Sequence, residues 1–338
     1  MELNKNKKII FILTLFFLVI LMTIICLFAG SSRMTIKDCF LAFAKKSTPA
    51  YNRIIWNIRI PRVLAALIAG AGLSVSGLIM QTNLNNPMAS PSTLGVSNAA
   101  VFGANICILA GFSSGFTFYA ASFMAFIFSL ISILFILGLC KIRAFSPTVV
   151  ILAGLAIGSI WTAATTILQF YSEEVGISAA VIWNFGDLGR ATYKSDLFMF
   201  IVVTMGTALF VLLSWKYNAL LSGDITAKTL GINIERVRFL SLLLASMITA
   251  VCISFLGIIG FVGIICPHIV KKIIGQDHRF TIPASVLSGS LLLLIADTLS
   301  RTLGNGSALP VGAITSLMGA PFFIAIIFSK KGAKYAEN

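Results

Sequence analysis

Few residues of this chain are placed to do chemistry. Its two histidines, His268 and His278, are ten residues apart, which does not fit the zinc-binding spacing of a metalloprotease helix. The sequence contains neither the Gly-x-x-x-x-Gly-Lys-Ser/Thr loop that cradles nucleotide phosphates nor a Gly-x-Ser-x-Gly nucleophile turn. We also find no clear pair of carboxylates for acid–base catalysis. The sequence therefore does not predict an enzyme.

The cysteines do not indicate a metal site either. All six are scattered, mostly inside apolar runs, and none has Cys-x-x-Cys spacing: Cys26, Cys39, Cys107, Cys140, Cys252 and Cys266. We expect small buried side chains rather than disulfides or metal ligands. His268 follows Pro267 but has no second histidine or carboxylate close by to complete an ion site.

Arginines offer the best-defined chemistry. Arg59 and Arg62 lie three residues apart around Pro61, at the start of an apolar run that extends to Gln81. Cations at a helix start oppose the helix macrodipole, so these side chains need another reason to be there. They could extend to lipid headgroups, or they could form a basic surface that binds an acidic partner. Arg301 has a further alternative, because Asp297 lies four residues earlier and could form an intrahelical pair.

Composition defines the class of protein that positions these residues. The chain is 58% hydrophobic and only 11% charged, and its mean hydropathy is +0.99. A soluble domain is about 45–50% apolar and about 25% charged. The net charge of +14 comes from lysines and arginines that lie mainly between apolar runs, as the positive-inside rule expects. We therefore predict an all-α polytopic membrane protein, and we expect no nucleic-acid partner.

The apolar runs predict about ten transmembrane helices in a single domain, 1–338, with both termini in the cytoplasm. A cleaved signal peptide ending near Ala29 is the alternative for the first run. The half-polar stretch 171–194 is expected to form an external cap or a short helix. The predicted organisation is a first span in 1–30, an external segment 31–59, spans two to six in 60–217, a cytoplasmic segment 218–233, spans seven to ten in 234–330, and a cytoplasmic tail 331–338.

Small residues mark the packing face of the second span. Ala66, Gly70 and Ser74 recur every fourth residue, a pattern that lets membrane helices approach closely. A polar turn over 85–92 follows on the cytoplasmic side. Farther along, Pro267 lacks the amide needed for one internal hydrogen bond, so it is expected to break the eighth span.

Several long motifs together resemble one family. They are RIPR at 59–62, NNPMASPSTLGVSNAA at 85–100, GDITAKTLGIN at 223–233, GIIGFVGIICPHIVKKIIGQDHR at 257–279, ADTLSRT at 296–302 and LPVGAITSLMGAPFF at 309–323. In this order they resemble the membrane permease of the iron-siderophore, vitamin B12 and haem class of ABC importers. The resemblance implies a dimer of ten-span permease subunits, identical or paralogous. It also implies two cytoplasmic ATPases and an extracytoplasmic binding protein.

The resemblance also implies roles for individual residues. Docking of the binding protein falls to Arg59, Arg62 and Arg301. The resemblance assigns coupling with the ATPase to the segment 218–233, through Leu221, Ser222, Gly223, Asp224, Ala227, Lys228, Leu230 and Gly231. The residues themselves predict two short helices joined by a turn there, in which Gly223 permits the turn, Asp224 caps a helix and Gly231 ends it; an ordinary solvated loop is the alternative.

Glycine and small polar residues in the spans indicate either close packing, including the dimer seam, or a translocation pathway. The residues expected to line a pathway are Ser159, Thr162, Gly260, Gly263, Pro267, Gly312 and Ser316.

The predicted function is transfer of a ferric siderophore into the cytoplasm by alternating access, with haem or vitamin B12 as the alternative cargo. The chain is expected to sit in the cell membrane and to bind no cofactor, since ATP and Mg²⁺ are used by the ATPase. A remote alternative is an ion-coupled secondary transporter. That class needs an acidic residue inside the membrane, and the predicted spans contain only Asp297, towards an outer end.

Overall fold

The structure, a computed structural model, describes residues 4–30, 34–110, 117–142, 146–303 and 308–327. The described residues are almost entirely helical and include one isolated β-bridge, between Phe185 and Ile258. Seven of their helices are long and apolar enough to cross a membrane. Helices α5, α13 and α15 coincide with three further predicted spans but are shorter, so the count of ten stays a prediction.

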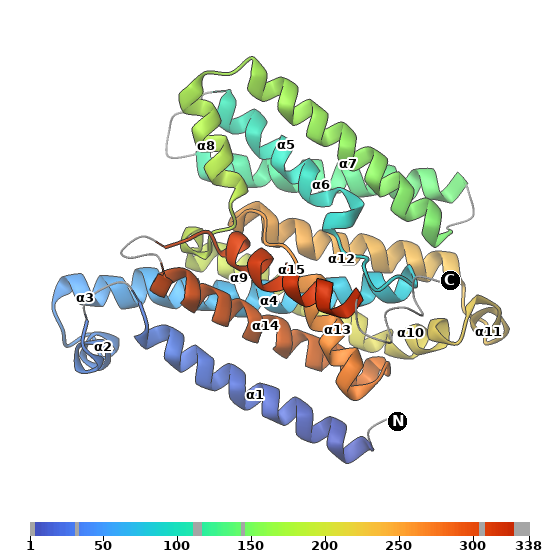
Figure 1. Cartoon of the computed structure of the whole chain (residues 1–338), viewed down its shortest axis with the longest axis horizontal. Helices are drawn as coiled ribbons and strands as arrows, with labels where there is room; N and C mark the ends of the chain where they lie inside the picture. Colours follow the sequence, from blue (N-terminus) through green and yellow to red (C-terminus); the bar gives the residue numbers. More distant parts are fainter. Residues whose placement is uncertain (1–3, 31–33, 111–116, 143–145, 304–307, 328–338) are drawn as a thin grey trace.

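Figure 1 shows two groups of helices. One group comprises α5 (Val96–Leu109), α6 (Thr117–Ile142), α7 (Pro147–Phe170) and α8 (Glu174–Asn184). The other comprises α1 (Lys5–Phe28), α4 (Ile60–Asn83), α9 (Tyr193–Leu212), α12 (Ile234–Leu256), α13 (Val262–Ile274), α14 (His278–Leu303) and α15 (Val311–Ile327). Short helices lie at the two ends of the bundle: α2 (Ile36–Phe43) and α3 (Pro49–Arg53) at one, α10 (Ser214–Leu221) and α11 (Asp224–Thr229) at the other.

Helix α4 is the central element of the second group. It packs against α9, α12, α13 and α14, and most of the span that includes it is buried. A methyl group added at Gly70 would overlap the backbone of Gly289 in α14, and one at Gly77 would overlap Gly263 in α13. The backbones therefore touch at two levels, as small residues in membrane helices allow. The predicted close-packing face of the second span is confirmed at Gly70.

The chain does not break at Pro267, which corrects one sequence prediction. Helix α13 continues through this residue. Proline has no amide to bond the carbonyl four residues earlier, which belongs to Gly263. The side-chain amide of Gln81 in α4 donates to that carbonyl oxygen at 3.2 Å. A neighbouring helix thus supplies the missing hydrogen bond, a common solution in membrane proteins.

The irregular backbone lies just before α13 instead. Helix α12 ends at Leu256, and Gly257 has a φ of +76°, which favours glycine. The freed groups are paired with the segment that follows α8: the amide of Asp187 donates to the Leu256 carbonyl at 2.8 Å. The Val311 amide, at the start of α15, donates to the Gly186 carbonyl at 2.8 Å. Non-helical backbone at this depth is therefore covered by protein.

Other predicted boundaries agree with the structure within a few residues. The run 147–170 coincides with α7, and 95–109 with α5. The half-polar stretch 171–194 contains α8 and a 3-10 turn, η3 (Leu188–Arg190), which confirms the predicted short helix. The second span starts earlier than expected, because α3 continues through a π-helical segment, η1 (Ile54–Arg59), directly into α4.

Substitution of Gly70 tests the close approach of α4 and α14. Gly70→Ala should lower the thermal unfolding midpoint in detergent, because the added methyl overlaps the Gly289 backbone; overpacking of this kind costs about 1–3 kcal/mol. Gly138→Ala in α6 is the matched control. No atom lies within 4 Å of its added methyl, so the usual helix preference for alanine, up to about 1 kcal/mol, should leave stability equal or higher. Equal midpoints would contradict the packing.

Candidate functional site

The three predicted docking arginines lie together at one end of the bundle, which we call the arginine end. Arg62 Nε contacts Asp297 Oδ1 of α14 at 2.5 Å, and Arg301 Nη2 contacts Asp297 Oδ2 at 2.9 Å. The Asp297 side chain is fully buried. Arg62 also lies 3.5 Å from Asp187, in the loop before η3. The intrahelical Asp297–Arg301 pair suggested by sequence is therefore present.

Arg59 and Arg301 also cap the end of α1. Arg59 Nη1 donates to the carbonyls of Leu27 at 2.7 Å and Phe28 at 3.0 Å. Arg301 donates to the carbonyls of Cys26 at 3.1 Å and Ala29 at 2.9 Å. The last carbonyls of a helix have no partner within it and carry partial negative charge. Arg59, which opposes the dipole at the start of α4, is thus stabilised by the carbonyls at the C-terminal end of α1.

Burial of these arginines bears on the docking prediction. Arg59, Arg62 and Arg301 are only 4–7% exposed, and their guanidinium groups bond to this chain. These contacts give them a structural role between α1, α4 and α14. Direct pairing with a binding protein stays a prediction. Among the residues that the structure describes, the exposed cations at this end are Lys37, Lys45, Lys46, Arg53 and Lys194.

The predicted coupling segment lies at the opposite end, which we call the α11 end. Its two short helices, α10 and α11, are joined by a turn at Ser222–Gly223, as predicted. Gly223 has a φ of +100° and Gly231 a φ of +78°, which confirms the turn and the left-handed residue after α11. Helix α10 begins at Ser214, earlier than the predicted segment, because the preceding span ends at Leu212.

Asp224 does not cap α11, contrary to prediction. It is the first residue of that helix, and its carboxylate pairs with Arg238 of α12 through contacts of 2.8 and 3.0 Å. Arg238 is 7% exposed, and its Nε donates to the carbonyl of Asn83, the last residue of α4, at 3.0 Å. The sequence analysis did not assign a role to Arg238. The available signal is the spacing of two arginines, Arg236 and Arg238, at the start of an apolar helix.

The faces of the coupling segment differ in exposure. Ala227 is fully buried against the bundle, whereas Ile225 is 81% exposed and Leu230 is 62% exposed. Leu221 and Lys228 are also exposed. Large apolar side chains exposed at the end of a bundle mark a surface for contact with another molecule.

A second polar link connects α10 to the bundle. The side chain of Asn218 accepts from both the backbone amide and Nδ1 of His278, at 2.8 and 2.9 Å. His278 Nε2 shares a hydrogen bond of 2.8 Å with the hydroxyl of Thr82 in α4. Asn218 donates to Asp277 at 2.8 Å. Hydrogen bonds from Arg279, assisted by Asn218, hold the pKa of Asp277 at about 2, so this carboxylate is ionised at neutral pH.

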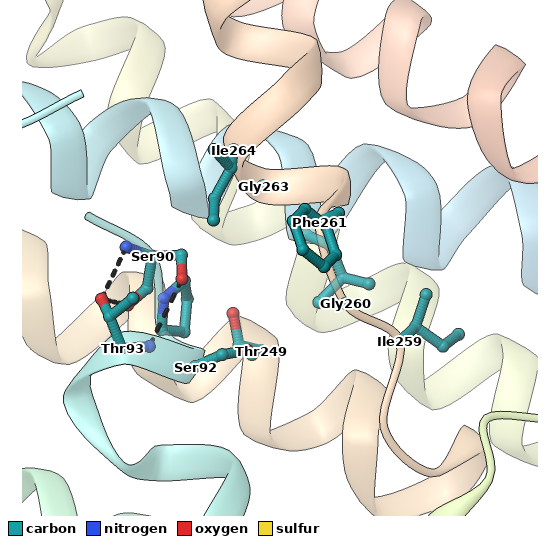
Figure 2. Close-up of a pocket in the computed structure, with 11 residues that line it drawn as sticks. Ser90, Ser92, Thr93, Thr249, Ile259, Gly260, Phe261, Gly263 and Ile264 are labelled. Carbon is teal, nitrogen blue, oxygen red and sulfur yellow. Dashed lines mark hydrogen bonds between the residues drawn. The ribbon is translucent and has the colours of Figure 1, made fainter. Parts of the chain in front are cut away.

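A cavity of about 240 Å³ lies between α4, α12, the start of α13 and the loop before α5. Figure 2 shows Ser90 and Thr93 on one side and the ring of Phe261 on the other, with Thr249 between them. The described residues that line it carry no charged side chain. The Thr249 hydroxyl is buried and makes no hydrogen bond within the described residues.

Phe261 is a lining residue that sequence reasoning missed. Its φ of +65° is rare for a bulky side chain and is often found at functional positions. The ring packs against Gly319 of α15, where an added methyl would overlap it. No sequence signal separates Phe261 from the apolar residues around it.

The predicted pathway residues lie in different places: some line the cavity, some are packed close to it, and two are exposed on α7. Gly260 and Gly263 line the cavity, and a methyl group added at Gly260 would lie 3.7 Å from the Ser316 hydroxyl. Gly312 packs against the Ile258 carbonyl, and Pro267 is buried in α13. The remaining members of the predicted set are Ser159 and Thr162, which are exposed on α7 rather than in the cavity; Asn98 of α5 donates to the Thr162 hydroxyl at 3.0 Å. Their assignment to a pathway stays a prediction.

Asp196 is a second buried carboxylate in the spans, which the sequence prediction did not include. Helix α9 begins at Tyr193, so Asp196 belongs to this span, and it is 3% exposed. Its carboxyl oxygens have no hydrogen-bond partner among the described residues. It lies in the first turn, where the helix dipole favours negative charge, and at the arginine end rather than mid-span. The statement that only Asp297 lies in the spans was therefore wrong.

The expected burial of the cysteines agrees with the structure. All six cysteines are buried and unpaired with one another. Within the described parts of the chain, no three histidine, cysteine or carboxylate side chains gather as metal ligands. His268 lies edge-on to Phe322, with ring centres 6.4 Å apart.

These apolar helices, with buried charges paired at their ends, define a multi-pass protein of the cell membrane. The model of the FecCD transport family matches residues 18–329, and the chain belongs to this family. It is accordingly an ABC importer permease, a transport subunit and not a catalytic enzyme.

Individual relatives agree with this assignment. The hemin transport permease of Yersinia pestis is 35% identical over 325 residues, covering 94% of this chain and 96% of the relative. The cobalamin import permease of Halobacterium salinarum is 35% identical over 275 residues, covering 81% and 73%. A solved structure described as an inward-facing conformation of a metal-chelate type ABC transporter aligns with a TM-score of 0.82 and 28% identity, covering 94% of this chain and 98% of that one.

Replacement of Asp297 tests the arginine network. Asp297→Asn removes the shared counter-ion of two buried guanidinium groups, so stability should fall by about 3–5 kcal/mol, the usual cost of breaking a buried pair. Glu174→Gln, an exposed change on α8, should leave the thermal unfolding midpoint in detergent unchanged. If the two variants unfold at the same temperature, the network does not hold these helices together.

Proposed function

We propose that this chain is the membrane subunit of an ATP-driven importer that passes a ferric siderophore into the cytoplasm by alternating access. The observation that carries this proposal is the match of nearly the whole chain to one importer family. Haem or a corrinoid is the alternative cargo, and the two relatives at 35% identity are named for hemin and cobalamin. Identity alone therefore does not choose the cargo.

Recognition of the cargo belongs to the binding protein in this proposal. The cavity beside α13 offers hydroxyl and apolar groups without a charged side chain among its described lining residues. Such a surface forms few directional contacts with an anionic chelate, so it lets the cargo pass without holding it tightly. A second permease subunit, identical or paralogous, would complete the pathway between the two chains.

The α11 end is proposed to face the cytoplasm and bind the ATPase. The exposed side chains of Ile225 and Leu230 provide apolar contact area, and Lys228 provides a cation. The turn at Gly223 and the left-handed Gly231 fix the shape of this projection. ATP and Mg²⁺ belong to the ATPase subunit, which converts closure around nucleotide into movement of this segment.

The arginine end is proposed to face outward and receive the binding protein. Arg59, Arg62 and Arg301 hold the ends of α1, α4 and α14 in place. The cations that meet an acidic partner directly are the exposed ones, Lys45 and Lys46 among them. Exposed charges of this kind set association rate and orientation.

Uptake into liposomes tests the function and the cargo. The importer is reconstituted with its ATPase and binding protein. It should accumulate a ferric siderophore only when ATP is present on the side of the membrane where the ATPase lies, and vanadate should stop this uptake. Hemin and cobalamin, supplied separately, should enter more slowly. Faster uptake of hemin or cobalamin would show that the cargo is not a siderophore. Uptake driven by an ion gradient without ATP would refute the proposal.

Charge reversal tests the docking surface. Lys45→Glu with Lys46→Glu should slow association with the binding protein by about tenfold at low salt and less at high salt, because screening weakens exposed charges. Surface plasmon resonance on the purified importer measures this rate. Lys5→Glu with Lys7→Glu, exposed at the other end of α1, is the control. Equal association rates for the two double variants would argue against docking at the arginine end.

A further inference from the structure

The last turn of α4 is linked to both short helices at the α11 end, each time through one residue of another helix. Asn83 and Thr82 are neighbours in sequence; Asn83 is bonded to Arg238 of α12, and Thr82 to His278 of α14. Asn83 connects through Arg238 to Asp224 of α11. Thr82 connects through His278 to Asn218 of α10.

The link through Arg238 is directional, and its guanidinium is buried. The guanidinium fork binds both carboxylate oxygens of Asp224, and its third nitrogen, Nε, donates to the Asn83 carbonyl. That carbonyl is among those at the helix end with no partner in α4, and a cation there is favoured by the dipole. A bidentate pair resists shear more than a single contact does, because two parallel bonds fix orientation. Lysine could not reproduce it.

The link through His278 is also fixed in geometry. The Asn218 oxygen can only accept, so His278 Nδ1 is the donor to it. The Asn218 nitrogen donates to Asp277, which fixes the orientation of the amide. His278 is fully buried, so water does not compete for these bonds. A third contact, Tyr217 to Ser241 at 2.9 Å, joins α10 to α12.

We propose that Arg238 and His278 are positioning residues that fasten the segment Ser214–Thr229 to the last turn of α4, so that displacement of this segment moves α4. The inference rests on the proposed coupling function of α10 and α11. Helix α4 then carries the movement along the bundle, since it is packed backbone to backbone on α13 and α14 and is paired with Asp297 at its other end. Neither residue need touch the ATPase.

Spin labels test this link in the complete importer with its ATPase and binding protein. One label is placed at Thr229→Cys on α11 and the other at Met88→Cys in the loop after α4; both positions are exposed, whereas all six native cysteines are buried. In the otherwise native chain the distance between the labels should be the same without nucleotide and with ATP and vanadate. In Arg238→Gln the distance should change on adding ATP and vanadate.

Stimulation of ATP hydrolysis by the binding protein provides the second readout, since it needs coupling across the membrane. Arg238→Gln should reduce this stimulation by at least about fivefold, in the range of typical coupling between sites, while the ATPase still copurifies. Arg236→Gln, two residues earlier and exposed, is the matched control. The inference requires both changes, and it is overturned if either readout matches that of the control.

Two further variants keep the outcomes separate. Should Arg238→Gln fail to fold, Asp224→Asn breaks the same pair from its half-exposed side and must meet the same two criteria. Ile225→Asp tests the proposed coupling surface itself and should prevent copurification of the ATPase. If Ile225→Asp copurifies like the native chain, the proposed coupling function fails. If it does not, and Arg238→Gln behaves as the control, only the present inference fails.

Discussion

Helix α4 has almost no freedom to move relative to its neighbours, because its contacts in the middle are backbone to backbone and its contacts at both ends are charged. The bare backbone at Gly70 and Gly77 leaves no flexible side chain to absorb a shift. Arg62 fixes one end to Asp297, and Arg238 binds the carbonyl at the other. Interfaces of this kind switch between discrete arrangements rather than deform continuously.

The lack of water inside a membrane explains why the polar contacts come in linked sets. Each unpaired backbone group or charge in lipid costs several kcal/mol, which favours polar residues that are paired with one another. Pro267 frees the Gly263 carbonyl, and Gln81 satisfies it while its own oxygen accepts from Lys271 at 3.1 Å. The arginine end follows the same rule with opposite charges. The carbonyls at the end of α1 and the carboxylate of Asp297 together balance three guanidinium groups.

Sequence reasoning predicted the helices well because lipid demands long apolar runs, and it located α7 and α5 almost to the residue. It also predicted the turn at Gly223, since few residues other than glycine tolerate that backbone conformation. It failed where the partner of a residue is distant in sequence. Gln81 and Gly263 are 182 residues apart. Only the fold shows that Gln81 supplies the hydrogen bond that Pro267 cannot make, so that α13 continues through the proline. Arg238 and Phe261 were missed for the same reason, since their roles depend on packing against other helices.

The same distinction explains how the docking arginines were interpreted. From sequence, cations at the start of a helix expected to face outward lack a structural reason, so a partner protein was the natural explanation. The fold supplies the reason, because α1 and α14 end beside the start of α4 and present carbonyls and Asp297 there. A buried guanidinium that is paired within its own chain is poorly placed to meet a partner, whereas an exposed lysine still has its full charge and mobility. In the proposed docking, attraction of an acidic protein depends on the exposed cations, and its orientation depends on the rigid base that the arginines maintain.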